Sequence, residues 1–247
     1  MQHQSRQLPD GSTALYAWFE AMHTRIDLLL RKKDTAPSSL LETAEAVRAL
    51  LLRLEQAGNR FESDSEISRL CKASAGMPVK LSEDLFDMLR IALHYHSTTG
   101  GLFDITVNTP EHTPETIKNV ELSESERTCT LHRTGMVLDL SGFIKGYALD
   151  RIRPLLAEHG VADALVSLGN SSIMAMGDVP GPVKDGCLTT SGNDTADRRH
   201  IINPLTGGYV CGQGSAQVRT VSGAEGEVMA KVRFMEEDDI IFRDTAD

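Results

Sequence analysis

Two stretches in the first hundred residues place apolar side chains at helical spacing. The first begins with a capping box, in which Glu42 follows Ser39 by three residues, and it ends at Gly58. Its apolar face consists of Leu40, Ala44, Val47, Leu51 and Leu54. The second begins at Ser82 and ends at Gly100-Gly101. Its inward face consists of Leu85, Met88, Leu89, Ala92 and Tyr95. The pattern therefore predicts two amphipathic helices, over about 39–58 and 82–100.

Shorter alternating stretches around these helices predict strands. Residues 14–30 alternate loosely before a polar turn at 32–37. Residues 129–133 and 136–140 flank Thr134-Gly135, which is typical of a hairpin. Two further strands, 164–168 and 172–176, are expected to meet at Gly169-Asn170.

The remainder of the chain predicts a third helix over about 145–159, a helix over 224–235 and a last strand near 240–242. Strands gathered between helices, without regular βαβ alternation, predict an α+β fold of mixed or antiparallel sheets packed with helices. The sequence has no internal repeat and no obvious interdomain linker. We therefore expect residues 1–247 to form a single compact domain.

Composition narrows the class of protein. A hydrophobic content of 40% and a charged content of 24% are ordinary for a soluble globular protein. The net charge of -10 argues against a nucleic-acid binder and against a partner of anionic membranes. The N-terminal residues contain no apolar signal region, and no apolar run is long enough to span a bilayer, so a cytoplasmic protein is expected. The four cysteines lack metal-site spacing and are expected to be small core residues.

The segment from Asp139 to Asp150 reads as a strand, a glycine turn and the start of a helix near Lys145. A helix N-terminus offers unpaired N–H groups and a positive dipole, to which Lys145 would add a full charge. This arrangement would suit an anionic ligand. A routine strand-to-helix turn with a solvated lysine fits the same spacing, so these residues alone leave both interpretations open.

Five segments, taken in order, resemble the motifs of the FAD:protein FMN transferase (ApbE) family. Asp139-Leu-Ser-Gly-Phe-Ile-Lys-Gly-Tyr-Ala-Leu-Asp150 is similar to the family pattern D-x-G-G-x-A-K-G-x-x-x-D. The segment beginning at Phe61, with Asp64-Ser65-Glu66, resembles Y-x-x-D-S-E-L-S-R-L-N. The remaining matches are Ala21-Met-His-Thr24, Thr99-Gly-Gly-Leu-Phe-Asp-Ile-Thr-Val107, and Thr190-Ser-Gly192 followed by His200-Ile-Ile-Asn-Pro-Leu-Thr-Gly207.

The resemblance implies that the chain binds FAD and transfers FMN to a threonine or serine hydroxyl of a target flavoprotein, releasing AMP. His200 and Lys145 would then be the catalytic residues, with His200 near the reacting phosphates. The positions that the resemblance assigns to FAD are Met22, Phe61, Leu102, Phe103, Asp104, Asp139, Lys145 and Ile201. Several of these segments also have a purely structural interpretation, because Ser65 would cap a helix and Gly100-Gly101 would end one.

The family also implies a magnesium site, and here the sequence departs from it. The matching positions are Gly142 through its carbonyl, Glu227 in place of an aspartate, and Lys231 in place of a threonine. An ammonium cannot ligate a metal and would repel Mg²⁺ nearby. Lys231 would therefore either replace the metal as a tethered cation or point to solvent, as helical lysines usually do, leaving the metal site lost.

Three functions follow from these observations. The first is an active FAD:protein FMN transferase with an altered cation site. The second is an FAD-binding paralogue that has lost transfer because of Lys231. The third is an interaction protein with no ligand, which the joint presence of Asp104, Asp139, Lys145 and His200 disfavours, since folding alone does not require that polar set.

Overall fold

The computed structural model describes residues 1–193, 200–212 and 214–244, with side chains as far as Glu236. The chain forms two compact units, each assembled from three separate segments. Unit 1 comprises Met1–Arg53, Lys145–Thr190 and Gln217–Glu227, and unit 2 comprises Leu54–Ile144, Ser191–Ala216 and Val228–Asp247. The chain passes from one unit to the other five times, so neither unit is a contiguous piece of sequence.

Seven strands form the larger sheet, in the order β1-β2-β3-β7-β8-β9-β10. Their bounds are Gln2–Gln7, Ser12–Ala21, Thr24–Lys33, Asp163–Leu168, Ser172–Met176, Gly186–Asn193 and Gly214–Thr220. The pairings from β1 through β9 are antiparallel. The strands expected within residues 14–30 are confirmed as β2 and β3, and the pair meeting at Gly169-Asn170 is confirmed as β7 and β8.

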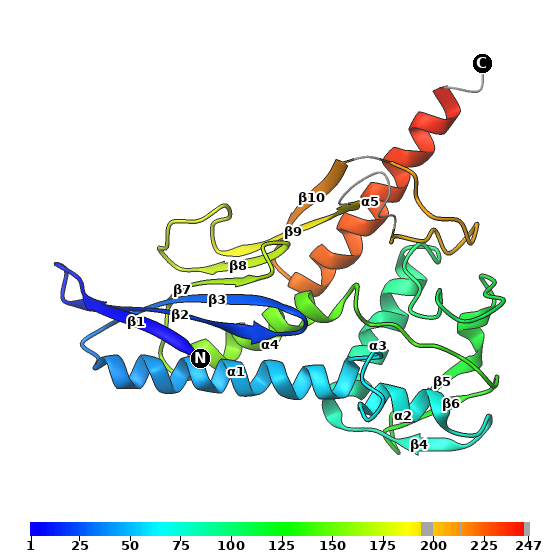
Figure 1. The fold of residues 1–247 in the computed structure, drawn as a ribbon, viewed down its shortest axis with the longest axis horizontal. Helices are drawn as coiled ribbons and strands as arrows, with labels where there is room; N and C mark the ends of the chain where they lie inside the picture. The colour runs from blue at the N-terminus through cyan, green and yellow to red at the C-terminus, as the bar shows by residue number, and fades with distance from the viewer. Residues whose placement is uncertain (194–199, 213, 245–247) are drawn as a thin grey trace. The chain divides into compact units, whose positions relative to one another are not determined.

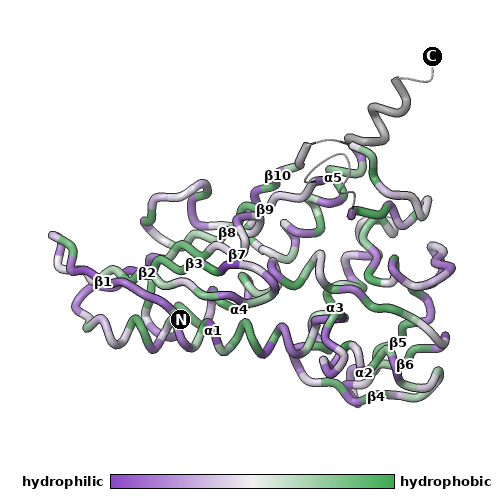
Figure 2. Tube along the Cα trace, viewed as in Figure 1, coloured by the Kyte–Doolittle hydropathy of each residue, from purple (hydrophilic) through white to green (hydrophobic). Residues whose placement is uncertain are grey.

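Strand β1 was not expected from the sequence. All six of its residues are polar and exposed, as the hydrophilic tube in Figure 2 also shows. It pairs with β2 from Gln2 opposite Trp18 to Gln7 opposite Thr13. Backbone hydrogen bonds to the more apolar strand β2 hold this edge strand in the sheet. Its own side chains are exposed to solvent, so they show no hydrophobic pattern from which a strand could be predicted.

Helix α1, Pro37–Gly58, confirms the first predicted amphipathic helix. Figure 1 shows it running alongside β1, β2 and β3. It begins two residues before the predicted capping box, with a proline at its first position, where the missing N–H is not needed. Helix α4, Ile144–Glu158, confirms the predicted third helix. In unit 1, the hydroxyl of Thr43 in α1 lies 3.2 Å from Nδ1 of His159, the residue that follows α4.

Unit 2 contains helices α2, Glu66–Lys72, and α3, Glu83–Thr98, with a short 3₁₀ helix, Thr116–Asn119. Ser65 caps α2 through its hydroxyl, as the sequence predicted, and Ser82, the predicted start of the second helix, caps α3 in the same way. A three-stranded antiparallel sheet has the order β4-β6-β5. Its strands are β4, Pro78–Lys80, β5, Val120–Ser123, and β6, Thr128–Leu131.

Two predictions of local structure were wrong. Residues 136–140 form no strand, and β6 pairs with β4 and β5 instead of forming a hairpin around Thr134-Gly135. The expected strand near 240–242 is part of helix α5, Gly223–Asp244, which continues past the predicted end at 235. In both cases a short apolar run fitted more than one kind of backbone, and periodicity alone could not decide between them.

The prediction that the cysteines are core residues is confirmed for Cys129 and Cys187, which are fully buried, whereas Cys71 and Cys211 are only partly buried. Burial raises the pKa of the Cys129 thiol to about 12 and that of Cys187 to about 11. In the part of the chain that the structure describes, no helix is long and apolar enough to cross a membrane.

Candidate active site

The end of helix α3 positions the motif that runs from Thr99 to Val107. Gly100 and Gly101 both have positive φ, at 62° and 88°, which lets the chain reverse after the helix. The N–H of Gly101 donates to the carbonyl of His96 at 2.9 Å, and the N–H of Phe103 donates to the Thr99 hydroxyl at 3.1 Å. The helix end therefore fixes the backbone immediately before Asp104.

The Asp104 side chain is fully buried, and protein donors occupy both of its carboxylate oxygens. Oδ1 accepts from the N–H and the hydroxyl of Thr106, each at 2.6 Å. Oδ2 lies 3.1 Å from Nε2 of His112. Since an ionised carboxylate only accepts, Nε2 of His112 must carry the proton in this contact. His96 stands farther away, with Nδ1 3.8 Å from Oδ2.

Asp139 precedes the glycine turn and is also held on both oxygens. Oδ1 accepts from the N–H of Ser141 at 2.8 Å, which closes a local turn. Oδ2 accepts from the Asn108 amide at 2.7 Å. Nε of Arg60 forms an ion pair with the same oxygen at 2.7 Å, although its N–H is not aligned for a hydrogen bond. The backbone N–H of Asp139 donates to the carbonyl of Ile105 at 2.7 Å, which joins this turn to the Asp104 motif.

These two motifs line one pocket in unit 2, with a cavity volume of about 130 Å³. The third contributor is the segment around Ile201, and the fourth is the part of α5 that carries Lys231. The complete lining is Leu102, Phe103, Asp104, Val107, Asn108, Asp139, Ser141, Gly142, His200, Ile201, Ile202, Pro204, Lys231 and Met235. Carboxylates, an ammonium and an imidazole thus share a small cavity with apolar walls.

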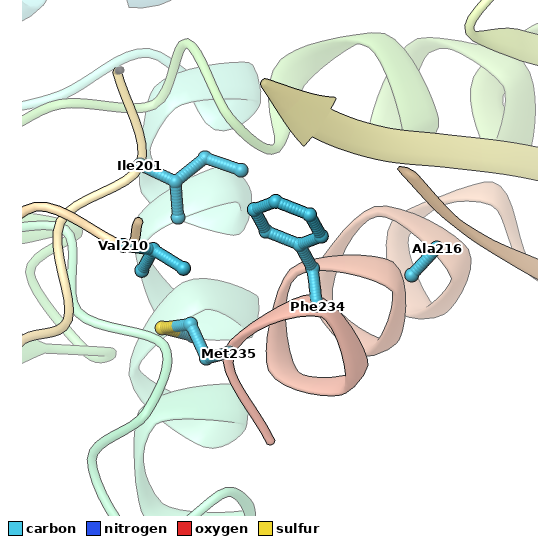
Figure 3. Packing of buried hydrophobic residues seen from close by; sticks show 5 residues of the cluster. All are labelled: Ile201, Val210, Ala216, Phe234 and Met235. Atoms are coloured by element: carbon cyan, nitrogen blue, oxygen red, sulfur yellow. The ribbon is translucent and has the colours of Figure 1, made fainter. Parts of the chain in front are cut away.

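A hydrophobic cluster anchors the Ile201 side of the pocket. Figure 3 shows Phe234 and Met235 of α5 beside Ile201 and Val210, with Ala216 at the far end. Leu102 packs against the same cluster. The N–H of Val210 donates to the carbonyl of Ile201 at 2.8 Å, so this segment is held to itself as well as to α5. The cluster explains why Ile201 is buried beside the exposed His200.

Unit 1 holds a second group of motif residues. The ammonium of Lys145 donates to the hydroxyl of Ser171, and the buried carboxylate of Glu227 accepts from the hydroxyl of Ser172. These serines begin strand β8 and the turn before it. Lys145 and Glu227 are therefore both held by side chains at the start of β8.

Asp150, the last residue of the glycine-turn motif, caps helix α5. Its carboxylate accepts from the Ser222 hydroxyl at 2.7 Å, from the N–H of Gly223 at 2.6 Å and from the N–H of Ala224 at 3.0 Å. A carboxylate at a helix N-terminus is favoured both by these bonds and by the helix dipole. The motif therefore positions the start of the helix that carries Glu227.

We expect Asp150→Ala to lower the free energy of unfolding by about 2 kcal/mol, because three donors at the start of α5 lose a charged acceptor. Urea denaturation followed by circular dichroism measures this change. Asp87→Ala is the matched control, since it removes an exposed pair with Arg90 and should shift stability by less than about 0.5 kcal/mol. Equal midpoints for the two variants would contradict the capping role.

Comparison with known proteins identifies the family. The family model described as ApbE family matches residues 22–241, which is most of the chain. The chain belongs to the ApbE family.

Relatives of this ApbE-family chain include the FAD:protein FMN transferase of Treponema pallidum. It is 26% identical over 159 residues, which cover 54% of this chain and 44% of that protein. A similar protein of the same description from Klebsiella pneumoniae is 25% identical, covering 53% and 45%. The chain spans about half the length of the curated relatives it matches.

Solved ApbE structures share the fold. The flavin transferase ApbE from Vibrio cholerae superposes with a TM-score of 0.77 at 19% identity, covering 91% of this chain and 87% of that one. The ApbE protein from Thermotoga maritima gives 0.75 at 18% identity, with 94% and 92% covered. The α+β fold and the family resemblance predicted from the motifs are thereby confirmed.

The structure of this ApbE-family chain brings eight of the twelve expected site residues into the unit 2 pocket. They are Leu102, Phe103, Asp104, Asp139, Gly142, His200, Ile201 and Lys231. Of the other four, Lys145 and Glu227 lie in unit 1 as described. Met22 also lies in unit 1, in the β2–β3 turn, where it and His23 have φ of 53° and 56°, unusual for residues other than glycine. Phe61 lies in unit 2 with 63% of its surface exposed, beneath the Arg60 guanidinium at 4.2 Å from the ring centre.

Three supporting residues were missed from the sequence: Arg60, Asn108 and His112. Asn108 follows the Thr99–Val107 motif directly, and that adjacency was a usable signal. Arg60 is adjacent to Phe61, whereas His112 is eight residues from its partner in an irregular segment. Irregular segments carry no periodicity from which a contact could be inferred.

The residues expected to hold magnesium do not fit a divalent ion in this structure. A β-carbon placed on Gly142 would stand 2.6 Å from Cε of Lys231 and 3.4 Å from its ammonium nitrogen, so the lysine stem lies against the glycine turn. Glu227 is engaged by Ser172. Among the described residues, no group of three or more His, Cys, Asp or Glu side chains could hold a metal ion. Lys231 lies on the pocket lining.

Proposed function

We propose that this ApbE-family chain binds FAD and transfers its FMN moiety to a threonine or serine hydroxyl of a flavoprotein acceptor, with release of AMP. One observation carries the proposal. Motif segments that are far apart in the sequence, at 102–108, 139–142 and 200–204, line a single pocket with two carboxylates and an imidazole, and α5 adds the ammonium of Lys231. The description of the family's relatives as FAD:protein FMN transferases supports the same activity. We further propose that both units belong to one ApbE-like domain, because the chain alternates between them.

The cavity is smaller than the roughly 300–1,000 Å³ typical of pockets that enclose a whole cofactor. It would therefore receive only part of FAD, and the ammonium of Lys231 and the imidazole of His200 favour the pyrophosphate. We assign Leu102, Phe103, Asp104, Asp139 and Ile201 to FAD here, and keep Met22, Phe61 and Lys145 as predicted contacts.

The reaction requires a new bond between the acceptor oxygen and the FMN phosphorus, while the bond from that phosphorus to the AMP oxygen breaks. The acceptor hydroxyl must lose its proton, and AMP leaves with the electron pair of the broken bond. We propose that His200 takes the proton, because it combines exposure with a place on the pocket lining. Lys145 of unit 1, whose ammonium donates to Ser171, stays a predicted catalytic residue.

Incubation with FAD and a flavoprotein subunit known to carry threonine-linked FMN tests the proposal. Transfer is measured as in-gel flavin fluorescence of the acceptor and as AMP in the filtrate. We expect His200→Gln to lower the rate by roughly a hundredfold or more while FAD binding stays within a few fold, since general base catalysis contributes about 10²–10⁴-fold. His94→Gln, a substitution at an exposed histidine of α3, is the control and should leave the rate unchanged.

The outcomes separate the candidate functions. AMP release together with acceptor fluorescence supports the transferase. Tight FAD binding without AMP release would leave only the FAD-binding paralogue. If FAD does not bind at all, the assignment of the pocket is wrong. A normal rate for His200→Gln, beside an active wild type, would overturn the role of His200 alone.

A further inference from the structure

The unit 2 pocket has a fixed positive charge where its family suggests a metal. Lys231 of α5 lines the pocket, and its stem lies against the glycine turn so closely that a β-carbon at Gly142 would be 2.6 Å from Cε. The ammonium nitrogen would be 3.4 Å from that same β-carbon position. The absence of a side chain at Gly142 is thus what allows the lysine to reach this side of the cavity.

The acidic side chains of the pocket are already engaged by other parts of unit 2. Asp104 accepts from Thr106 on one oxygen and contacts His112 with the other. Asp139 accepts from the backbone at Ser141 with one oxygen, and its other oxygen meets Asn108 and Arg60. Each carboxylate is thus already held by protein donors, and the Arg60 guanidinium already pairs with the charge of Asp139, so less of that charge is left to attract a second cation.

Magnesium needs a near-octahedral set of oxygen ligands, and an ammonium supplies no lone pair. Its charge would also oppose a divalent ion placed beside it. A phosphate, in contrast, accepts hydrogen bonds from an ammonium and gains from its charge. The pocket therefore combines poor ligands for a metal with a good donor for an anion.

We infer that Lys231 takes the electrostatic role of a divalent cation, so that the pocket binds the pyrophosphate of FAD without metal. This inference rests on the proposed function, because it concerns the same pocket and ligand. It differs from the expectation drawn from the family, in which Mg²⁺ offsets the phosphate charge. Here one tethered ammonium, supplied by the chain itself, performs that task at the ligand-binding step.

The test is a titration of the purified, flavin-free protein with FAD, followed by flavin fluorescence, in buffer with EDTA and in buffer with excess Mg²⁺. We expect the two dissociation constants to agree within about twofold. Lys231→Met removes the charge and keeps a similar stem, so FAD binding should weaken roughly tenfold to a hundredfold, the range for a charged hydrogen bond. Riboflavin, which has no phosphate, should bind wild type and variant equally.

Lys118→Met is the matched control, because Lys118 lies at the exposed surface of unit 2 and pairs with Glu115. It should bind FAD as the wild type does. A thermal melt of each variant verifies folding, and Lys231→Gln serves as a second neutral variant should the methionine variant unfold.

FAD binding that disappears in EDTA and returns with Mg²⁺ would overturn the inference and leave the proposed function standing. Unchanged FAD affinity in both neutral variants would overturn it as well. Equal weakening of FAD and riboflavin would mean that Lys231 only supports the pocket's shape, which also contradicts a role toward phosphate. If the wild type binds FAD in neither buffer, the proposed function itself fails.

Discussion

Gly146→Ala is expected to lower the free energy of unfolding by about 3 kcal/mol or more, because the added methyl group would collide with backbone. A β-carbon at Gly146 would lie 2.1 Å from the carbonyl oxygen of Gly223 and 2.4 Å from its carbonyl carbon. The approach is mutual, since a β-carbon at Gly223 would lie 2.5 Å from the Gly146 carbonyl oxygen. The first turns of α4 and α5 therefore meet backbone to backbone within unit 1.

Neither partner in this contact can move aside as a flexible side chain could. The same β-carbon would also lie 2.6 Å from Cγ of Glu227, whose carboxylate is held by Ser172. Relief of the clash would thus disturb Glu227 and the cap that Asp150 provides at Gly223. Gly146 of the glycine-turn motif is therefore required for the packing of α4 against α5.

Urea denaturation followed by circular dichroism measures the effect, with Gly208→Ala as the control. Gly208 does not have a positive φ, and a β-carbon there meets only the Thr206 hydroxyl at 3.6 Å. Its substitution should change stability by less than about 0.5 kcal/mol. Matching midpoints for Gly146→Ala and the wild type would show that α4 and α5 do not approach as described.

The parts of the fold that the sequence predicts well are those with a regular apolar period. The face made by Leu40, Ala44, Val47, Leu51 and Leu54 is buried along α1. The face of α3 behaves in the same way, with Leu85, Met88, Leu89 and Ala92 buried. Periodicity reports burial on one side of an element, so it succeeds where a single face meets the core.

The elements that were missed lack such a period. Strand β1 is polar throughout and is defined by pairing with β2. Residues 136–140 look like a strand, yet the backbone of Asp139 pairs with Ile105 and that of Leu138 with the Cys71 sulfur. Contacts between distant segments decide such stretches, and no local pattern encodes them.

In the candidate site, too, some residues could be predicted from the sequence and others could not. Ordered motifs predicted eight pocket residues through family resemblance, including Asp104, Asp139 and His200. Their roles toward FAD stay predictions. What the motifs could not supply was the set of partners, such as Arg60 and His112, that fix the carboxylates. Partners of this kind depend on tertiary proximity, which no local sequence pattern encodes.

Asp104→Ala is expected to be the most damaging substitution in the pocket, lowering the free energy of unfolding by about 3 kcal/mol and weakening FAD binding. The Asp104 side chain has no exposed surface, so water cannot replace it as an acceptor without entering the core. Its loss would leave the N–H and hydroxyl of Thr106 and Nε2 of His112 without their buried partner. The substitution therefore removes the hydrogen-bond acceptor of three donors at once.

Asp104→Asn separates this structural effect from the effect of charge. An asparagine oxygen can still accept from Thr106, and its amide can face His112 if the imidazole adopts the other tautomer. We expect it to lose less than about 1.5 kcal/mol of stability. Thr106→Val is the matched control, because it removes one donor and keeps the N–H, and it should cost about 1 kcal/mol. Chemical denaturation ranks the three variants, and FAD titration of the folded ones follows. If Asp104→Ala is as stable as Thr106→Val, the carboxylate is not the centre that organises this pocket.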